Sequence, residues 1–171
     1  LLDCMGNGGV AKGTILDGWE MGIGDSHGRA SGAIDYSRYT ANRGLAGFET
    51  QKGCRGVCTY CAEANHPVIF KNPEKVIDEI AELVSRGVTD FHLCDTEFNQ
   101  DLDRSKAFLR ALIRRKLPMK WALYLKTDPY DSELFALIAE SGAHLVTVSV
   151  PTGVRSVENA GKICRLAKAH G

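Results

Sequence analysis

The feature that most constrains the fold is a regular alternation of two kinds of segment from residue 44 onwards. Short segments rich in β-branched and aromatic residues predict strands at residues 45–50, 88–94, 120–126 and 144–150. Each is followed by an amphipathic segment, and these predict helices at residues 73–86, 103–116, 131–141 and 156–169. Strict alternation of strand and helix indicates an α/β fold in which right-handed helical crossovers join parallel strands.

The first expected helix has clear boundary signals. Asn72 can cap its first turn, Pro73 suits a position whose N–H needs no partner, and Glu74 faces the positive end of the helix dipole. Its apolar residues recur at helical spacing, at Val76, Ile77, Ile80, Leu83 and Val84. Gly87 then ends the helix.

Two architectures fit this alternation, an open doubly wound sheet and part of a (β/α) barrel. A full barrel needs about 250 residues, so a chain of 171 residues would hold only part of one. In both architectures ligands bind at the carboxyl ends of the strands. The segments expected at that rim are residues 53–61, Asp95–Glu97, Lys126–Asp128 and Ser149–Thr152. Cysteines, carboxylates, a lysine and hydroxyls are therefore expected to converge there.

The loop of residues 53–61 carries Cys54, Cys58 and Cys61 at C-x3-C-x2-C spacing. A disulfide between two of them would leave the third without a partner, so we expect the group to hold a metal. Three thiolates can bind three irons of a [4Fe–4S] cluster and leave the fourth iron open, because full protein ligation needs four cysteines. His66 follows Cys61 closely, and a closed Cys3His zinc site is therefore the alternative.

Composition narrows the class of protein. The 21 basic and 21 acidic residues balance, which argues against nucleic acid and anionic membranes as partners. No apolar run approaches the roughly 20 residues of a membrane span, and the N-terminus does not resemble a signal peptide. Six cysteines without secretory context indicate thiols or metal ligands in a reducing compartment. We therefore expect a cytoplasmic protein in which Cys4, Cys94 and Cys164 are structural and buried.

The cysteine loop also carries a family resemblance. Gly53–Cys61, with the sequence GCRGVCTYC, resembles the signature of the radical S-adenosylmethionine (SAM) superfamily, including an aromatic residue directly before the third cysteine. The segments Phe48–Cys54 and Phe91–Asn99 resemble those superfamily members that carry an N-terminal cobalamin-binding-type domain. Residues 35–171 would then be a truncated radical SAM core, and residues 1–34 the tail of the upstream domain and a linker.

This resemblance implies a partial (β/α) barrel of the radical SAM type, with four β/α units present after an irregular Gly-rich segment. It implies that Cys54, Cys58 and Cys61 hold a [4Fe–4S] cluster whose open iron is chelated by SAM. Reduction of the cluster would cleave SAM to a 5′-deoxyadenosyl radical. Cobalamin-assisted methyl transfer, cyclisation and methylthio transfer all fall within that chemistry. A zinc-stabilised, non-catalytic binding module is the alternative.

The resemblance also suggests binding residues and partners. It places Tyr60 beside the adenine, Asp95 or Glu97 at the methionine ammonium, Lys126 at the methionine carboxylate and Ser149 at the ribose. The cofactors implied are the [4Fe–4S] cluster and SAM, with cobalamin in the upstream domain as an addition. The partners implied are a small-molecule or peptide substrate and an electron donor such as flavodoxin or ferredoxin.

The two ends of the sequence raise a further expectation. The chain begins at Leu1, and it ends at Gly171 where another strand would be due, so we expect a fragment of a longer protein. Asp25-Ser26-His27 begins like the D-x-H-x-x-G loop in which a histidine ligates cobalt, but Ala30 stands at the glycine position, which favours a polar surface turn. Residues 35–39 are expected to form an irregular connector.

Overall fold

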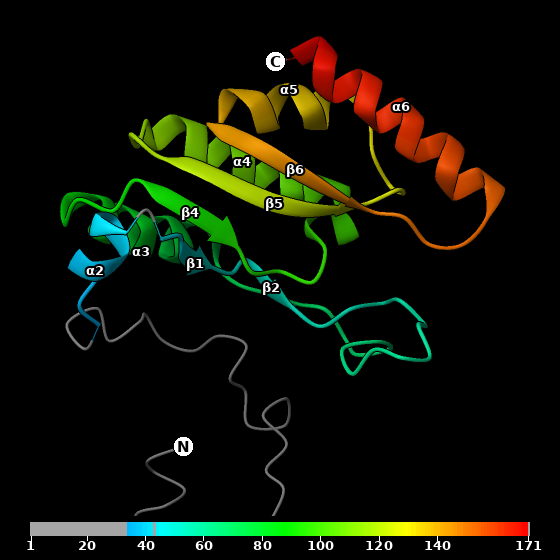
Figure 1. Ribbon diagram of the computed structural model, residues 1–171, viewed down its shortest axis with the longest axis horizontal. Helices are drawn as coiled ribbons and strands as arrows, with labels where there is room; N and C mark the ends of the chain where they lie inside the picture. The colour runs from blue at the N-terminus through cyan, green and yellow to red at the C-terminus, as the bar shows by residue number, and fades with distance from the viewer. Residues whose placement is uncertain (1–33, 43, 171) are drawn as a thin grey trace, which may run out of the picture.

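The computed structural model describes residues 34–42 and 44–170 (Figure 1). The region assigned above to an upstream domain and the Asp25–His27 loop lie outside these residues, apart from residue 34. The central elements are four strands, each followed by a helix. They are β1 (Ala46–Phe48), α3 (Pro73–Ser85), β4 (Asp90–Leu93), α4 (Leu102–Arg115), β5 (Lys120–Lys126), α5 (Ser132–Glu140), β6 (Ala143–Ser149) and α6 (Val154–His170).

The four strands form one parallel sheet in the order β1-β4-β5-β6. A doubly wound sheet would reverse direction at a switch point, whereas here the spatial order equals the chain order. Right-handed crossovers that always step the same way put every helix on one side of the sheet. The helices contact each other in the sequence α3, α4, α5, α6, and Figure 1 shows them following the strands. The fold is therefore a section of a (β/α) barrel, which confirms the predicted class and decides between the two architectures.

The core lies between the sheet and these helices. Phe48, Phe91 and Trp121 on three adjacent strands pack against one another, with Phe98 and Phe108 completing an aromatic cluster. Side chains alternate along the strands, so the opposite face of the sheet carries a different set. On that face, among the described residues, Tyr124 and Leu145 remain 39% and 55% exposed.

Side-chain caps begin three of the helices, and the cap at Asn72 confirms the one predicted above. Asn72 accepts hydrogen bonds from Glu74 N at 3.0 Å and from Lys75 N at 3.4 Å at the start of α3. Asp101 caps α4 and Asp131 caps α5 through their carboxylates. The helix α4 starts one residue earlier than expected, because Asp101 supplies its cap, and α6 starts two residues earlier than expected.

Four short elements differ from expectation. The helix α2 (Ser37–Ala41) begins within residues 35–39, which were predicted as an irregular connector. The cysteine loop is enclosed by an antiparallel pair, β2 (Gln51–Lys52) and β3 (Ile69–Phe70), and η2 (Phe98–Gln100) is a 3-10 turn after β4. The elements β2, β3 and η2 have only two or three residues, too few to show periodicity, which explains why the sequence did not predict these three.

No helix in the described part of the chain is both long enough and apolar enough to span a membrane.

Candidate functional site at the carboxyl ends of the strands

The segment that contains the cysteine loop leaves the sheet at the end of β1 and returns through β3. Within it, His66 N donates to Cys54 O at 3.1 Å, Asn65 N to Gly56 O at 2.6 Å and Cys61 N to Cys58 O at 3.2 Å. The three loop cysteines are free thiols, with Cys54 buried and the other two exposed. Among residues 34–42 and 44–170, no three His, Cys, Asp or Glu side chains are arranged to hold a metal ion.

Two glycines shape the loop around Cys54. Gly53 has a φ of +85°, a backbone conformation that favours glycine, directly before the buried cysteine. A Cβ at Gly56 would lie 3.2 Å from Cys54 Sγ and 3.9 Å from both Cys58 Sγ and Lys126 Nζ. The backbone at Gly56 thus lies close to two thiols and an amine, and a side chain there would occupy the space between them.

Asp95 is buried, and its carboxylate is used within the chain. It accepts hydrogen bonds from Thr50 N at 2.7 Å and Gln51 N at 3.2 Å, and also from the Thr50 hydroxyl. Burial raises its pKa to about 7, although these hydrogen bonds act in the opposite direction. Asp95 therefore joins the end of β4 to the start of the cysteine loop.

Glu97, two residues further on, has different surroundings. Its Oε2 atom is buried and has no hydrogen-bond partner among the described residues. Burial raises the pKa of Glu97, while a hydrogen bond with Ser149 and the charge of Lys126 lower it. Lys126 and Ser149 are register partners at the ends of β5 and β6. Three residues expected at the rim are thus neighbours, and one of them has an unused buried acceptor.

Lys126 connects this group to the cysteine loop, because its Nζ lies 3.5 Å from Cys54 Sγ. Tyr60, in contrast, is 90% exposed on the outer part of the loop, near Cys58 and Cys61. A hydrogen bond to Cys58 raises the pKa of Tyr60. The structure therefore brings together Cys54, Glu97, Lys126 and Ser149, and places the other candidates on the exposed part of the loop or, for Asp95, beneath it.

The sequence did not single out the residues that support this arrangement. Gln100 contacts the backbone on both sides of Cys54, and Asn99 contacts the backbone of Lys126. Gln51 donates to the backbone carbonyl of Glu97. Gln51 and Asn99 lie in the two segments that resemble cobalamin-associated members of the superfamily, but nothing in those segments indicates these contacts.

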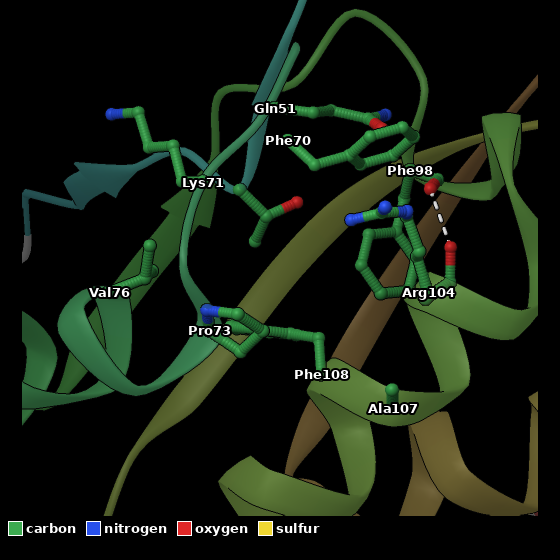
Figure 2. Close-up of a pocket in the computed structure, with 11 residues that line it drawn as sticks. Gln51, Phe70, Lys71, Pro73, Val76, Phe98, Arg104, Ala107 and Phe108 are labelled. Carbon is green, nitrogen blue, oxygen red and sulfur yellow. Dashed lines mark hydrogen bonds between the residues drawn. The ribbon is translucent and has the colours of Figure 1, made fainter. Parts of the chain in front are cut away.

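A small pocket lies outside this group, between β2, β3 and the first turns of α3 and α4 (Figure 2). Its volume is about 130 Å³, and the Arg104 guanidinium lies over the Phe70 ring at 4.6 Å. Ligand pockets are commonly about 300–1,000 Å³. Neither the three loop cysteines nor Tyr60, Asp95, Glu97, Lys126 and Ser149 line it, so we do not assign it to a cofactor.

The cysteines outside the loop correct one expectation. Cys94 and Cys164 are exposed, not buried. Cys94 directly follows β4 and lies on the open face of the sheet, where a Cβ at Gly47 would approach its sulfur to 2.6 Å. The alternation of β4 continues to this residue, so Cys94 shares the face of His92, opposite the buried Phe91 and Leu93. Cys4 lies outside the described residues.

A known protein family matches the part of the chain that contains this site. Residues 48–168 match the family described as the Radical SAM superfamily. The matched region includes the cysteine loop and all four β/α units except the first residues of β1 and the last of α6. The chain belongs to this superfamily, which confirms the resemblance of the cysteine signature.

Among curated proteins, the chain is similar to the tryptophan 2-C-methyltransferase of Streptomyces laurentii, at 30% identity over 67% of this chain and 21% of that protein. It is 32% identical to the cytidylyl-2-hydroxyethylphosphonate methyltransferase of Streptomyces wedmorensis, over 71% of this chain and 23% of that protein. The anaerobic magnesium-protoporphyrin IX monomethyl ester cyclase of Cereibacter sphaeroides is 31% identical over 59% of this chain and 17% of that protein. The chain thus spans less than a quarter of the length of these relatives.

Solved structures agree on the fold. The radical SAM methyltransferase TsrM from Kitasatospora setae, with tryptophan and a SAM analogue bound, superposes with a TM-score of 0.74 at 25% identity, over 81% of this chain and 30% of that one. A second TsrM structure, with cobalamin and a [4Fe–4S] cluster bound, gives a TM-score of 0.73 at 24% identity, over 81% of this chain and 29% of that one.

Proposed function

We propose that this chain is the cluster- and SAM-binding part of a radical SAM enzyme. The observation that carries the proposal is the buried, unpartnered Glu97 Oε2 at the same rim as three free cysteines in the superfamily's signature loop. A buried carboxylate oxygen without a partner is costly, and a cationic ligand group would satisfy it. The donor set also fits a cluster, because three thiolates leave one iron for an exogenous ligand.

When bound, a [4Fe–4S] cluster and SAM supply reductive cleavage of a sulfonium to a carbon radical, while the protein supplies binding and orientation. Cys54, Cys58 and Cys61 would hold the cluster. Glu97 would accept hydrogen bonds from the methionine ammonium, since a carboxylate and a cationic amine form a strong charge-assisted pair. We assign this role to Glu97 and not to Asp95, because both Asp95 oxygens already accept hydrogen bonds from Thr50.

The neighbouring side chains have complementary roles. Lys126, at the end of β5, would offset the negative charge of the cluster and pair with the methionine carboxylate. Ser149 would bind the ribose from the end of β6. Tyr60 would pack beside the adenine, since its exposed ring is available to stack on a base. Together these residues would orient SAM across the carboxyl ends of three strands.

Methyl transfer is the reaction class that we propose for the whole protein. Two of the curated relatives are methyltransferases, and TsrM carries cobalamin as well as a cluster in its solved structure. Cobalamin bound by residues outside this core, a small-molecule substrate and a reduced flavodoxin or ferredoxin as electron donor would complete such a system. The cytoplasm, where thiols stay reduced, suits this chemistry.

Anaerobic reconstitution with iron and sulfide tests the proposal. We expect about four irons per chain, a brown chromophore and 5′-deoxyadenosine formation from SAM after reduction with dithionite. Cys58→Ser should lose most of the bound iron, whereas Cys164→Ser, at an exposed cysteine outside the loop, should retain it. A colourless chain that binds one zinc tightly and takes up no iron would overturn the proposal in favour of a zinc-binding module.

A further inference from the structure

The turn η2 lies between the cysteine loop and the end of β5, and both of its amide side chains are buried. We propose that Asn99 and Gln100 are positioning residues, which fix Cys54 against Lys126 and thereby set the reduction potential of the cluster. This inference rests on the proposed function in one respect, that Cys54 is a cluster ligand. Neither amide would touch the cluster, so each acts through the backbone that it holds.

Gln100 holds the peptide groups on both sides of Cys54. Its Oε1 accepts a hydrogen bond from Arg55 N at 3.0 Å, and its Nε2 donates to Gly53 O at 2.8 Å. The hydroxyl of Thr96 also donates to Gly53 O at 2.9 Å and accepts from Gln100 Nε2 at 3.2 Å. One buried carboxamide therefore fixes the orientation of the backbone that carries the buried thiol.

Asn99 does the same for Lys126. Its Oδ1 accepts from Lys126 N at 2.8 Å, and its Nδ2 donates to Lys126 O at 3.0 Å and to Pro129 O at 2.6 Å. Asn99 is 0% exposed, so water cannot replace these contacts. The adjacent amides of one short turn thus hold the backbone of Cys54 and of Lys126, which are 72 residues apart in the sequence.

Fixing both backbones also fixes the contact between the side chains of Lys126 and Cys54. Lys126 Nζ lies 3.5 Å from Cys54 Sγ, and Cys54 is the buried member of the three loop cysteines. Hydrogen bonds and positive charge near a cluster sulfur stabilise the added negative charge of the reduced state and raise its potential. Burial strengthens this electrostatic effect. If either amide contact is lost, Lys126 and Cys54 can separate, and the cluster becomes harder to reduce.

Two isosteric variants test the inference in the reconstituted chain. Gln100→Glu removes the donor to Gly53 O, and Asn99→Asp removes the donors to Lys126 O and Pro129 O while keeping an acceptor for Lys126 N. We expect each to lower the ratio of reduced to oxidised cluster at a fixed potential about tenfold, which for a one-electron couple is about 59 mV. The readouts are a redox titration and the electron paramagnetic resonance spectrum of the reduced cluster.

A milder variant and two controls accompany them. Thr96→Val removes one hydroxyl and its two hydrogen bonds, to Gly53 O and from Gln100 Nε2. It keeps the test valid if the carboxylate variants fail to fold, and it should shift the potential in the same direction by less. Asn42→Asp repeats the amide-to-carboxylate change on an exposed residue. Ile138→Ala destabilises the core on α5, away from the site. Both controls should keep the potential of the unaltered chain.

The results separate a positioning role from a merely structural one. Variants of Thr96, Asn99 or Gln100 that melt at a lower temperature but keep the potential and spectrum of the unaltered chain would overturn the inference. A potential that shifts equally in Ile138→Ala would do so as well. If the unaltered chain binds no iron, the proposed function fails first and the inference falls with it, a result distinct from unchanged potentials in loaded variants.

Discussion

At the scale of single residues, the site depends on two carboxylates with opposite surroundings. Asp95 points toward the cysteine loop and is satisfied by Thr50 and Gln51, whereas Glu97 keeps a buried oxygen without a partner in the described chain. They are only two positions apart, but they follow a strand end where the backbone leaves the regular pleat. One is therefore suited to hold the chain together and the other to receive a ligand.

This difference predicts the effect of Glu97→Gln. The amide removes the negative charge that would pair with the methionine ammonium, and a charge-assisted hydrogen bond contributes about 1.5–3 kcal/mol. We expect SAM to bind about ten- to a hundredfold more weakly to the reconstituted chain, with unchanged iron content. Equilibrium dialysis measures the affinity. Glu63→Gln, at an exposed carboxylate just after the cysteine loop, is the matched control, and equal losses in both variants would contradict the assignment.

Asp95 predicts an unusual dependence of stability on pH. Its pKa is about 7 in the folded chain against an ordinary value of 3.8, so between these values the folded state holds a proton that the unfolded state has released. The unfolding free energy contributed by this group is therefore full below about pH 4 and falls as the pH rises to about 7. From pH 5 to pH 8 the loss is on the order of 2 kcal/mol.

Asp95→Asn isolates this contribution. An amide can still accept from the two backbone N–H groups and can donate to the Thr50 hydroxyl, but it does not titrate. Urea unfolding of both proteins is measured under reducing conditions at pH 5 and at pH 8. From pH 5 to pH 8 the unaltered chain should lose more unfolding free energy than the variant. An equal change in unfolding free energy for the two proteins would contradict the raised pKa of Asp95.

The sequence predicts only those parts of the site whose residues lie close together along the chain. Cys54, Cys58 and Cys61 lie within one loop, so their spacing can be recognised directly as the signature of the superfamily. The choice between Asp95 and Glu97 depends on side-chain direction beyond a strand end, which no periodicity encodes. The contacts of Asn99 and Gln100 join residues 27 to 47 positions apart, and a single sequence gives no measure of such pairs.

At the scale of elements, the sequence predicts the capped helices and the buried strands, but it does not predict the β2–β3 pair that flanks the cysteine loop. Asn72 with Pro73 and the alternating strand Lys120–Lys126 carry local signals that the packed structure keeps. The β2–β3 pair is only two residues long on each side, and it forms because Gln51 and Phe70 meet at the edge of the loop. Tertiary contacts therefore fix the cysteine loop, and the strand propensity of its flanking residues does not.

Gly56 should be essential to that loop. Gly56→Ala would place a methyl group 3.2 Å from Cys54 Sγ, in the space between the thiols, so we expect iron content and SAM cleavage after reconstitution to fall severalfold. Gly161→Ala is the matched control, because its Cβ meets only Arg165 at 3.6 Å within α6, and alanine there should add about 0.5–1 kcal/mol of stability. Iron analysis and thermal melting distinguish the two. Full iron uptake by Gly56→Ala would contradict the role given to this glycine.

At the scale of the whole molecule, the sheet has one covered face and one open face. Helices cover the first, whereas Tyr124 and Leu145 lie exposed on the second, and β6 pairs only with β5 in the described chain. In a (β/α) barrel that face looks into the barrel, and further strands continue from such an edge. The arrangement that places Glu97, Lys126 and Ser149 at one rim therefore also leaves apolar side chains and backbone groups of an edge strand accessible.

An accessible edge strand with an exposed apolar face predicts that the 171-residue chain associates with itself. Sedimentation velocity should show assemblies that grow with protein concentration. Leu145→Lys puts a charge on the open face of β6, a substitution that discourages edge pairing, and should shift the population toward monomer without lowering the melting temperature by more than a few degrees. Val157→Lys adds the same charge at a 63% exposed position on α6. If both variants reduce association equally, net charge and not the β6 face governs it, whereas an effect confined to Leu145→Lys locates the contact on the open face of β6.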